Sequence, residues 1–142
     1  MRLGDQVSIW ANATLRGDIA AIRVGAGSNI QDNSCLHVDN DEPVDIGESV
    51  VVGHSCVIHG CSIGDGCLIG MGSTVLSGAK VGAGSLVAAG SLLLEGREYP
   101  PNSMIMGSPA KVRRETTEAE REKIRRNAER YVALSREYLK ES

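Results

Sequence analysis

The sequence predicts an all-β protein, a parallel β-helix whose short strands stack in three-sided coils, followed by one α-helix. Three observations predict this fold. Aliphatic residues recur at steps of six, and a small residue tends to follow four places later. The 142-residue chain contains 17 Gly and one Trp but no Phe. A core without large aromatic rings is built from Val, Ile, Leu and Ala, in a shape that needs many tight turns.

The aliphatic ladder defines the coil. A step of six residues is too short for a strand–helix unit and fits one short strand plus a corner. The ladder slips in register after Leu15, Leu36 and Ile58, so three hexads make one coil. Stacked coils pair each strand with its neighbours and bury the ladder along the axis. Five coils are predicted from Leu3 to about Gly96, with the ladder Leu3, Ile9, Leu15, Val24, Ile30, Leu36, Ile46, Val52, Ile58, Ile63, Ile69, Val75, Val81, Val87 and Leu93.

The cysteines have a structural explanation. Cys56 and Cys67 fall in the small-residue column that Ser and Ala otherwise occupy, where a free Cys behaves as a small hydrophobe. No CxxC spacing indicates a cysteine metal site. The N-terminus shows no apolar signal segment, so we expect free thiols in a cytoplasmic protein.

The composition changes at Tyr99-Pro100-Pro101. We expect a β-helix domain over residues 1–98, a connecting loop over 99–115 and a helix over 116–142. Thr117 and Glu120 have the spacing of a capping box. A narrow apolar stripe, which would lie against a flat face of the prism, follows at helical spacing: Ile124, Ala128, Tyr131, Ser135 and Tyr138.

Charge and hydropathy exclude two classes of partner. The 15 Lys and Arg are outnumbered by 18 Asp and Glu, which argues against nucleic-acid binding. No apolar stretch reaches the roughly 18–20 residues of a membrane span. The helix mixes Glu and Arg on its polar face, which argues against a membrane-surface role.

All three histidines lie close together in the ladder. His37 and His59 each follow the aliphatic residue of a third hexad, in adjacent coils, and should stack about 4.8 Å apart. That spacing suits two ligands of one metal ion. His54 belongs to a second hexad and should leave a different face, so a neighbouring molecule would have to complete a three-His site. The register therefore predicts an oligomer, and a three-sided prism suggests a threefold ring.

Three histidines with an open fourth position are typical of catalytic zinc. Polar residues surround them, and Arg16 shares the column of His37 and His59, where it would anchor an anion. Turn capping by the histidines is the plainer alternative, but it does not explain their stacking. The candidate catalytic residues beside the histidines are Arg16, Asp18, Asn29, Gln31 and Asp32.

From Trp10 to Lys111 the sequence resembles the γ-class carbonic anhydrases, which are hexapeptide-repeat proteins with a left-handed β-helix. The resemblance rests on Leu15-Arg16-Gly17-Asp18, Asn29-Ile30-Gln31-Asp32, Leu36-His37 and Gly53-His54-Ser55-Cys56-Val57-Ile58-His59-Gly60. It implies a homotrimer that hydrates CO2 to bicarbonate at a metal between subunits, by attack of a metal-bound hydroxide.

The resemblance also implies roles for individual residues. His37 and His59 would bind the metal from one subunit, and His54 from its neighbour. Gln31 would orient the metal-bound hydroxide or the substrate. Arg16, Asp18 and Asp32 would organise the interface and the bicarbonate region, and the nearby amide of Asn29 belongs to the same set.

Two positions depart from the family pattern. Ile19 and Asn40 stand where acidic residues of the proton relay are expected, so turnover should be modest unless Asp39, Asp41 or Glu42 serves instead. Zinc is the expected metal, and histidine ligands also suit iron or cobalt. Two alternatives remain. One is a hexapeptide-repeat acyltransferase, because the loop Gly107-Ser108-Pro109-Ala110-Lys111 resembles the C-terminal loop of such enzymes. The other is a metal-binding scaffold with little activity.

Overall fold

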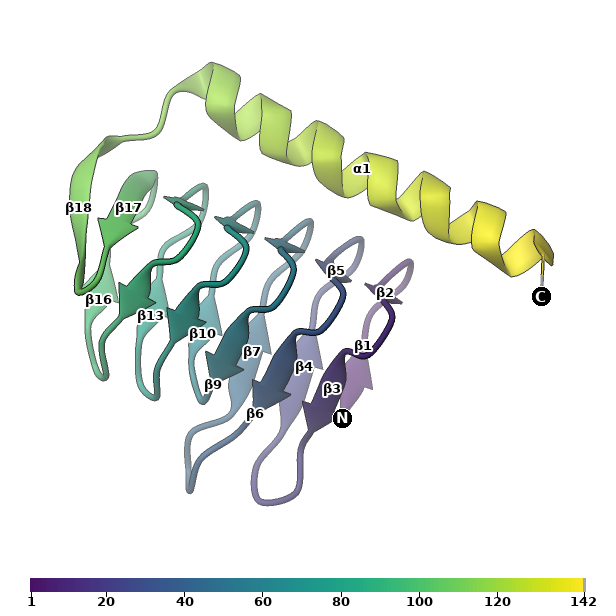
Figure 1. Ribbon diagram of the computed structural model, residues 1–142, viewed down its shortest axis with the longest axis horizontal. Coiled ribbons are helices and arrows are strands. Elements are labelled where there is room, and N and C mark those ends of the chain that lie inside the picture. Colours follow the sequence, from purple (N-terminus) through teal and green to yellow (C-terminus); the bar gives the residue numbers. More distant parts are fainter. Residues whose placement is uncertain (142) are drawn as a thin grey trace.

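The computed structural model describes residues 1–141 as a left-handed parallel β-helix of about six coils, with one helix along its side (Figure 1). Each face of the triangular prism is one sheet. Face A consists of β1 (Arg2–Leu3), β4 (Ile22–Val24), β7 (Val44–Ile46), β10 (Ser62–Ile63), β13 (Lys80–Val81) and β16 (Glu98–Tyr99). Face B consists of β2 (Ser8–Ile9), β5 (Asn29–Ile30), β8 (Val51–Val52), β11 (Leu68–Ile69), β14 (Leu86–Val87), β17 (Ser103–Gly107) and β18 (Ala110–Glu115). Face C consists of β3 (Thr14–Arg16), β6 (Cys35–His37), β9 (Val57–His59), β12 (Thr74–Val75) and β15 (Leu92–Leu93).

The interior of the prism is the predicted aliphatic ladder. From Val24 to Leu93 every ladder residue is at most 4% exposed. Strand register places Leu36, Ile58 and Val75 of successive coils directly above one another. Leu3 and Ile9 stay 45% and 38% exposed, because the described chain stacks on only one side of the first coil. The predicted fold class is confirmed.

The ladder extends beyond its predicted end. Tyr99 pairs with Val81 and Ile105 with Val87, so β16 and β17 begin a sixth coil beyond the five expected. Tyr99 fills an aliphatic position at 5% exposure, and the prolines that follow it conceal this in the sequence. The expected connecting loop over 99–115 is therefore wrong. These residues hold three strands, and β18 pairs antiparallel with β17 at the end of face B.

The helix α1 (Glu118–Glu141) starts two residues after the expected position 116. The predicted capping box precedes it: the Thr117 N–H donates to Glu120 Oε1 at 2.9 Å, and the Glu120 N–H donates to Thr117 Oγ1 at 3.1 Å. From there α1 runs back along face B toward the first coil (Figure 1). Its buried side chains pack on face B, namely Ile124 and Ala128 against Val51, Leu68 and Leu86. Residue 142, which ends the expected helix, lies outside the described residues.

The outward side chains differ among the three faces. Face A is charged, with ion pairs of 2.7 Å between Arg23 and Asp45 and of 3.7 Å between Lys80 and Glu98. Face B is covered by α1. Figure 1 shows β3, β6 and β9 of face C on the side away from α1. The column of outward residues that runs along face C carries no charge: Thr14, Cys35, Val57, Thr74 and Leu92.

Within residues 1–141, no helix is both long enough and apolar enough to cross a membrane.

Candidate metal centre

The irregularities of the repeat gather at one corner of the prism, between faces C and A. Longer loops follow β3 and β6 there, over 17–21 and 38–43, whereas only Gly60 and Cys61 separate β9 from β10 (Figure 1). Arg16 pairs in register with His37, and His37 with His59, so the three side chains form the predicted column. We call these three residues the histidine corner.

The two imidazoles of the histidine corner meet edge to face. Their ring centroids are 5.0 Å apart with an interplanar angle of 64°. Nδ1 of His37 lies 3.1 Å from Nε2 of His59. The pairing that the register predicted is therefore present as a direct contact between ring nitrogens.

The outer nitrogens of both rings are held by oxygen atoms. Nε2 of His37 lies 3.0 Å from Asp18 Oδ1. Nδ1 of His59 lies 2.8 Å from Ser77 Oγ, and that hydroxyl donates to Asp39 Oδ2 at 3.1 Å. The contact with His37, followed by the Arg16 guanidinium, lowers the pKa of Asp18. The Asn40 N–H, followed by Ser77, lowers the pKa of Asp39.

These contacts determine which nitrogen carries the proton in each neutral ring. An ionised carboxylate only accepts hydrogen bonds, so Asp18 takes the Nε2–H of His37. The single proton of the Ser77 hydroxyl goes to Asp39, so its oxygen accepts from the Nδ1–H of His59. The remaining lone pairs, on His37 Nδ1 and His59 Nε2, then face each other across 3.1 Å.

Two facing lone pairs repel unless a cation lies between or beside them. Two nitrogens at about 2.0–2.1 Å from one tetrahedral zinc lie roughly 3.4 Å apart, close to the distance observed here. Metal-ligating histidines almost always place their other nitrogen on a carboxylate or another oxygen, as both rings do. His37 and His59 therefore fit a metal ion as two of its ligands.

His54 lies at the opposite corner of face C, in the turn between β8 and β9. Its Nδ1 lies 3.3 Å from Asp32 Oδ1. The geometry of this contact is not that of a hydrogen bond, so the nitrogen has no hydrogen-bond partner. Its side chain is 46% exposed. Among residues 1–141, no group of three or more His, Cys, Asp or Glu residues is arranged to hold a metal ion. One chain thus brings two of the histidines together and leaves the third apart.

The remaining predicted residues divide between the two corners. Arg16 donates to Asp18 Oδ2 beside the histidine pair. Asp32 lies beside His54 at the other corner. Gln31 Nε2 donates to Asn29 Oδ1 at 3.0 Å, and both side chains are buried, 6% and 1% exposed. The side-chain amide nitrogen of Asn29, Nδ2, has no hydrogen-bond partner.

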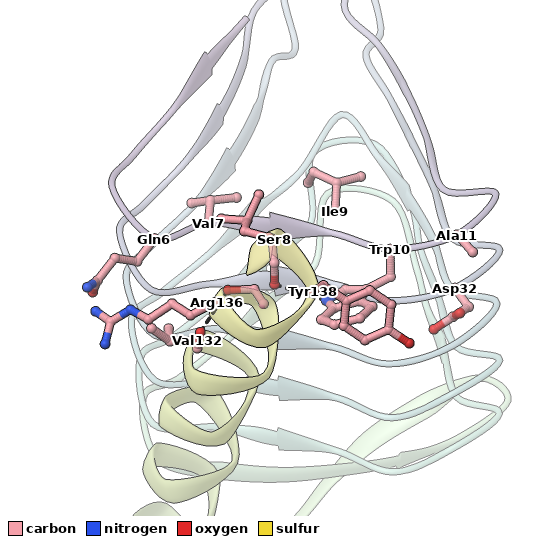
Figure 2. A pocket seen from close by; sticks show the side chains of 12 residues that line it. Gln6, Val7, Ser8, Ile9, Trp10, Ala11, Asp32, Val132, Arg136 and Tyr138 are labelled. Carbon is pink, nitrogen blue, oxygen red and sulfur yellow. Dashed lines mark hydrogen bonds between the residues drawn. The ribbon is translucent and has the colours of Figure 1, made fainter. Parts of the chain in front are cut away.

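A pocket of about 730 Å³ adjoins the second corner. Figure 2 shows the rings of Trp10 and Tyr138 side by side, with the Asp32 carboxylate beyond them. Trp10 makes edge-to-face contacts with Tyr131 and Tyr138, at centroid distances of 5.4 and 5.1 Å. The sequence interpretation assigned these rings no part in a site. Trp10 follows β2, and the return of α1 along face B brings Tyr131 and Tyr138 to it.

The cysteines do not add ligands. All four cysteines are free, as expected. Cys56, Cys61 and Cys67 are buried, which for Cys56 and Cys67 agrees with their predicted structural role. Burial raises the pKa of Cys61 to about 12 and that of Cys67 to about 11, which keeps both as thiols at neutral pH.

The sequence interpretation also missed Ser77 as a hydrogen-bond partner of His59. It considered Asp39 only as a substitute proton relay. A signal for Ser77 was available. Val57 and Ile58 pair with Thr74 and Val75, so Ser77 comes one residue after the position level with His59.

Comparison with known proteins adds the relatives of this chain. The family model "Bacterial transferase hexapeptide (six repeats)" matches residues 43–77 and 60–94. A Methanocaldococcus jannaschii protein named "Probable carbonic anhydrase" is 47% identical over 94% of this chain and 84% of its own length. A carbonic anhydrase of Geobacillus kaustophilus is 41% identical over 96% of this chain and 75% of its own length. The crystal structure of a hexapeptide transferase family protein from Anaplasma phagocytophilum superposes with a TM-score of 0.91 at 43% identity. The match covers 96% of this chain and 80% of that one.

Proposed function

The chain belongs to the γ-class carbonic anhydrase family of hexapeptide-repeat proteins, and from this premise we propose that it catalyses the reversible hydration of CO2 to bicarbonate with a metal ion held between subunits of a homotrimer. The observation that best supports this function is the pair of imidazoles at the histidine corner. Both outer nitrogens are engaged, and the two free ones face each other at 3.1 Å. Turn capping alone does not account for that arrangement.

The third ligand supports an oligomer. His54 lies across face C from His37 and His59, with its exposed ring away from their contact. A second chain whose His54 corner meets the histidine corner of the first would complete a three-His site. Repeating that contact around a threefold axis gives a closed ring.

The surface of face C suits such an assembly. Face A is charged and face B is covered by α1, whereas the outward column of Thr14, Cys35, Val57, Thr74 and Leu92 on face C carries no charge. Val57, in its middle coil, is 41% exposed there. Interface cores are depleted of charged residues, as this column is.

The chain's own residues then have definite tasks. A bound zinc ion would lower the pKa of a water molecule toward about 7 and so supply a nucleophile at neutral pH. Arg16, fixed by Asp18, offers guanidinium N–H groups to the bicarbonate anion. Gln31, held by Asn29, presents a fixed amide to substrate. Asp32 places a carboxylate 3.3 Å from His54 Nδ1, on the ring that would reach the neighbouring chain.

The identity of the metal is part of the proposal. Zinc is our choice, and the three imidazoles also accept iron or cobalt. The four free thiols support a reducing compartment, the cytoplasm.

Acyl transfer is the second candidate, favoured by the transferase names of the matched family model and of the Anaplasma phagocytophilum structure. Such a reaction needs a histidine free to act as a general base. The nitrogens of His37 and His59 are turned toward each other or toward oxygen partners, which leaves His54, whose Nδ1 has no hydrogen-bond partner, for that role. A scaffold that holds the metal without useful turnover is the third candidate.

Stopped-flow CO2 hydration by the zinc-loaded protein tests the proposal. We expect activity that His37→Ala and His54→Ala both abolish and that Lys80→Ala, on face A, leaves intact. Bound zinc without hydration would indicate the scaffold. Thiol release from acetyl-coenzyme A, with an amine or alcohol as acceptor and without zinc, would indicate acyl transfer.

A further inference from the structure

We propose that Ser77 and Asp39 form a positioning relay for His59, which holds its Nε2 lone pair toward the metal. The inference rests on the proposed function and deepens it. Neither residue touches substrate, and both act through the imidazole of His59.

The relay is a continuous chain of hydrogen bonds across three coils. Asp39 lies in the loop after β6, His59 ends β9, and Ser77 follows β12. The distances are 2.8 Å from His59 Nδ1 to Ser77 Oγ and 3.1 Å from Ser77 Oγ to Asp39 Oδ2. Asp39 Oδ1 accepts the Asn40 N–H at 2.9 Å, so both carboxylate oxygens are engaged.

The backbone around the relay brings Asp39 to Ser77. Asp39 and Glu42 exchange backbone hydrogen bonds of 3.1 Å, which close the loop into a small hairpin. Residue 60 leaves room for the contact because it is glycine. A Cβ there would lie 3.2 Å from Ser77 Oγ and 3.4 Å from Asp39 Cβ, and its φ of +52° also favours glycine.

The direction of the hydrogen bonds gives the relay its effect. The Ser77 hydroxyl has one proton, which goes to Asp39, so its oxygen accepts the Nδ1–H of His59. That tautomer leaves Nε2 unprotonated on the side of His37. Without the hydroxyl, the His59 ring loses the partner that selects its tautomer and orientation. Removing such a partner typically weakens metal binding about 10–100-fold.

Two measurements on the full-length protein test the relay. The first is the imidazole ¹⁵N spectrum of the metal-free protein, which reports the tautomer of His59. We expect the Nδ1–H form in the wild type and in Ser77→Thr, and its loss in Ser77→Ala. The second is zinc affinity by competition with a chromophoric chelator. We expect Ser77→Ala to bind roughly 10–100-fold more weakly. Asp39→Asn, whose amide can reverse the hydrogen bond to Ser77, should weaken binding as well.

The matched control is Ser62→Ala, the same change in the same coil on face A, which should alter neither quantity. An unchanged His59 tautomer together with wild-type zinc affinity in Ser77→Ala would overturn the relay while leaving the proposed function intact. Weaker zinc binding with an unchanged tautomer would also overturn it. A wild-type protein that binds no zinc would overturn the proposed function, and the tautomer spectrum would still decide whether Ser77 selects the Nδ1–H form.

Discussion

Nδ1 of His37 lies 3.1 Å from Nε2 of His59, although 22 residues separate them in sequence. The contact follows from strand register, because β6 and β9 pair with His37 opposite His59. Asp18 and Ser77 hold the outer nitrogens of the two rings. A solenoid thus converts a repeat in sequence into a column of aligned side chains, and the irregular corner supplies the atoms that hold the two rings.

The uncharged outward column on face C, with Val57 in its middle, leads to a prediction about assembly. Val57→Lys should convert a trimer to monomers, because it places a charge in the middle of an apolar contact. Sedimentation velocity measures the change, and zinc should be lost with the trimer. Ser62→Lys, on the charged face A, is the control and should remain trimeric. A trimer that persists in Val57→Lys would mean that another face forms the interface.

The loop over 38–43 leads to a prediction about proton export. Ile19 and Asn40 stand at positions where acidic residues are expected, and Asp39 is already engaged by Asn40 and Ser77. Hydration turnover should therefore be modest and should rise with buffer concentration, since small buffer molecules must collect the proton. Asn40→Glu should raise turnover at low buffer and leave kcat/KM for CO2 nearly unchanged.

Stopped-flow assays across a buffer series measure both quantities. A wild-type rate that is already high and independent of buffer would contradict this account. It would indicate that Asp41 or Glu42 carries the proton.

Acid stability should depend on the capping box of α1. Hydrogen bonding to Arg114, and then to the Thr117 N–H, lowers the pKa of Glu120 to about 2, below its ordinary value of 4.5. A carboxyl with a lowered folded-state pKa stabilises the fold above its unfolded pKa and loses that contribution as the pH falls through the folded value. The difference in urea midpoint between wild type and Glu120→Gln should thus be largest near neutrality. It should disappear as the pH falls from 4.5 to about 2.

The control for this measurement is Glu118→Gln, an exposed glutamate in the same first turn. Its effect should be smaller at neutral pH. A gap for Glu120→Gln that stays constant from neutral to strongly acid pH would contradict the assignment.

Much of the fold was predictable because a hexapeptide ladder encodes position directly. Once Leu36 and Ile58 are placed in one column, His37 and His59 must stack, as they do. Tyr99 escaped prediction because an aromatic ring occupies an aliphatic position just before two prolines. The hairpin of β17 and β18 was not predicted because the antiparallel strand β18 lies outside the six-residue repeat.

The site was predictable only in part. The column of Arg16, His37 and His59 depends on register alone, whereas the roles of Ser77 and Asp39 depend on how the loop over 38–43 folds back. The Trp10 and Tyr138 contact depends on where α1 ends its path along face B, which helical periodicity does not specify. Asp32 was expected to help organise the subunit interface, and within one chain it lies beside His54.

Each metal site should take His37 and His59 from one chain and His54 from another. His54→Ala and His37→Ala proteins should each bind no zinc, because two histidines hold zinc far less tightly than three.

Zinc content after equimolar co-refolding of these two variants is the most direct test. A site is complete only where a His54→Ala chain supplies His37 and His59 and a His37→Ala chain supplies His54. Random mixing in a threefold ring should therefore restore about a quarter of the wild-type zinc per chain. A mixture as empty as either variant alone, or a His54→Ala protein that keeps its full zinc, would contradict a site shared between chains.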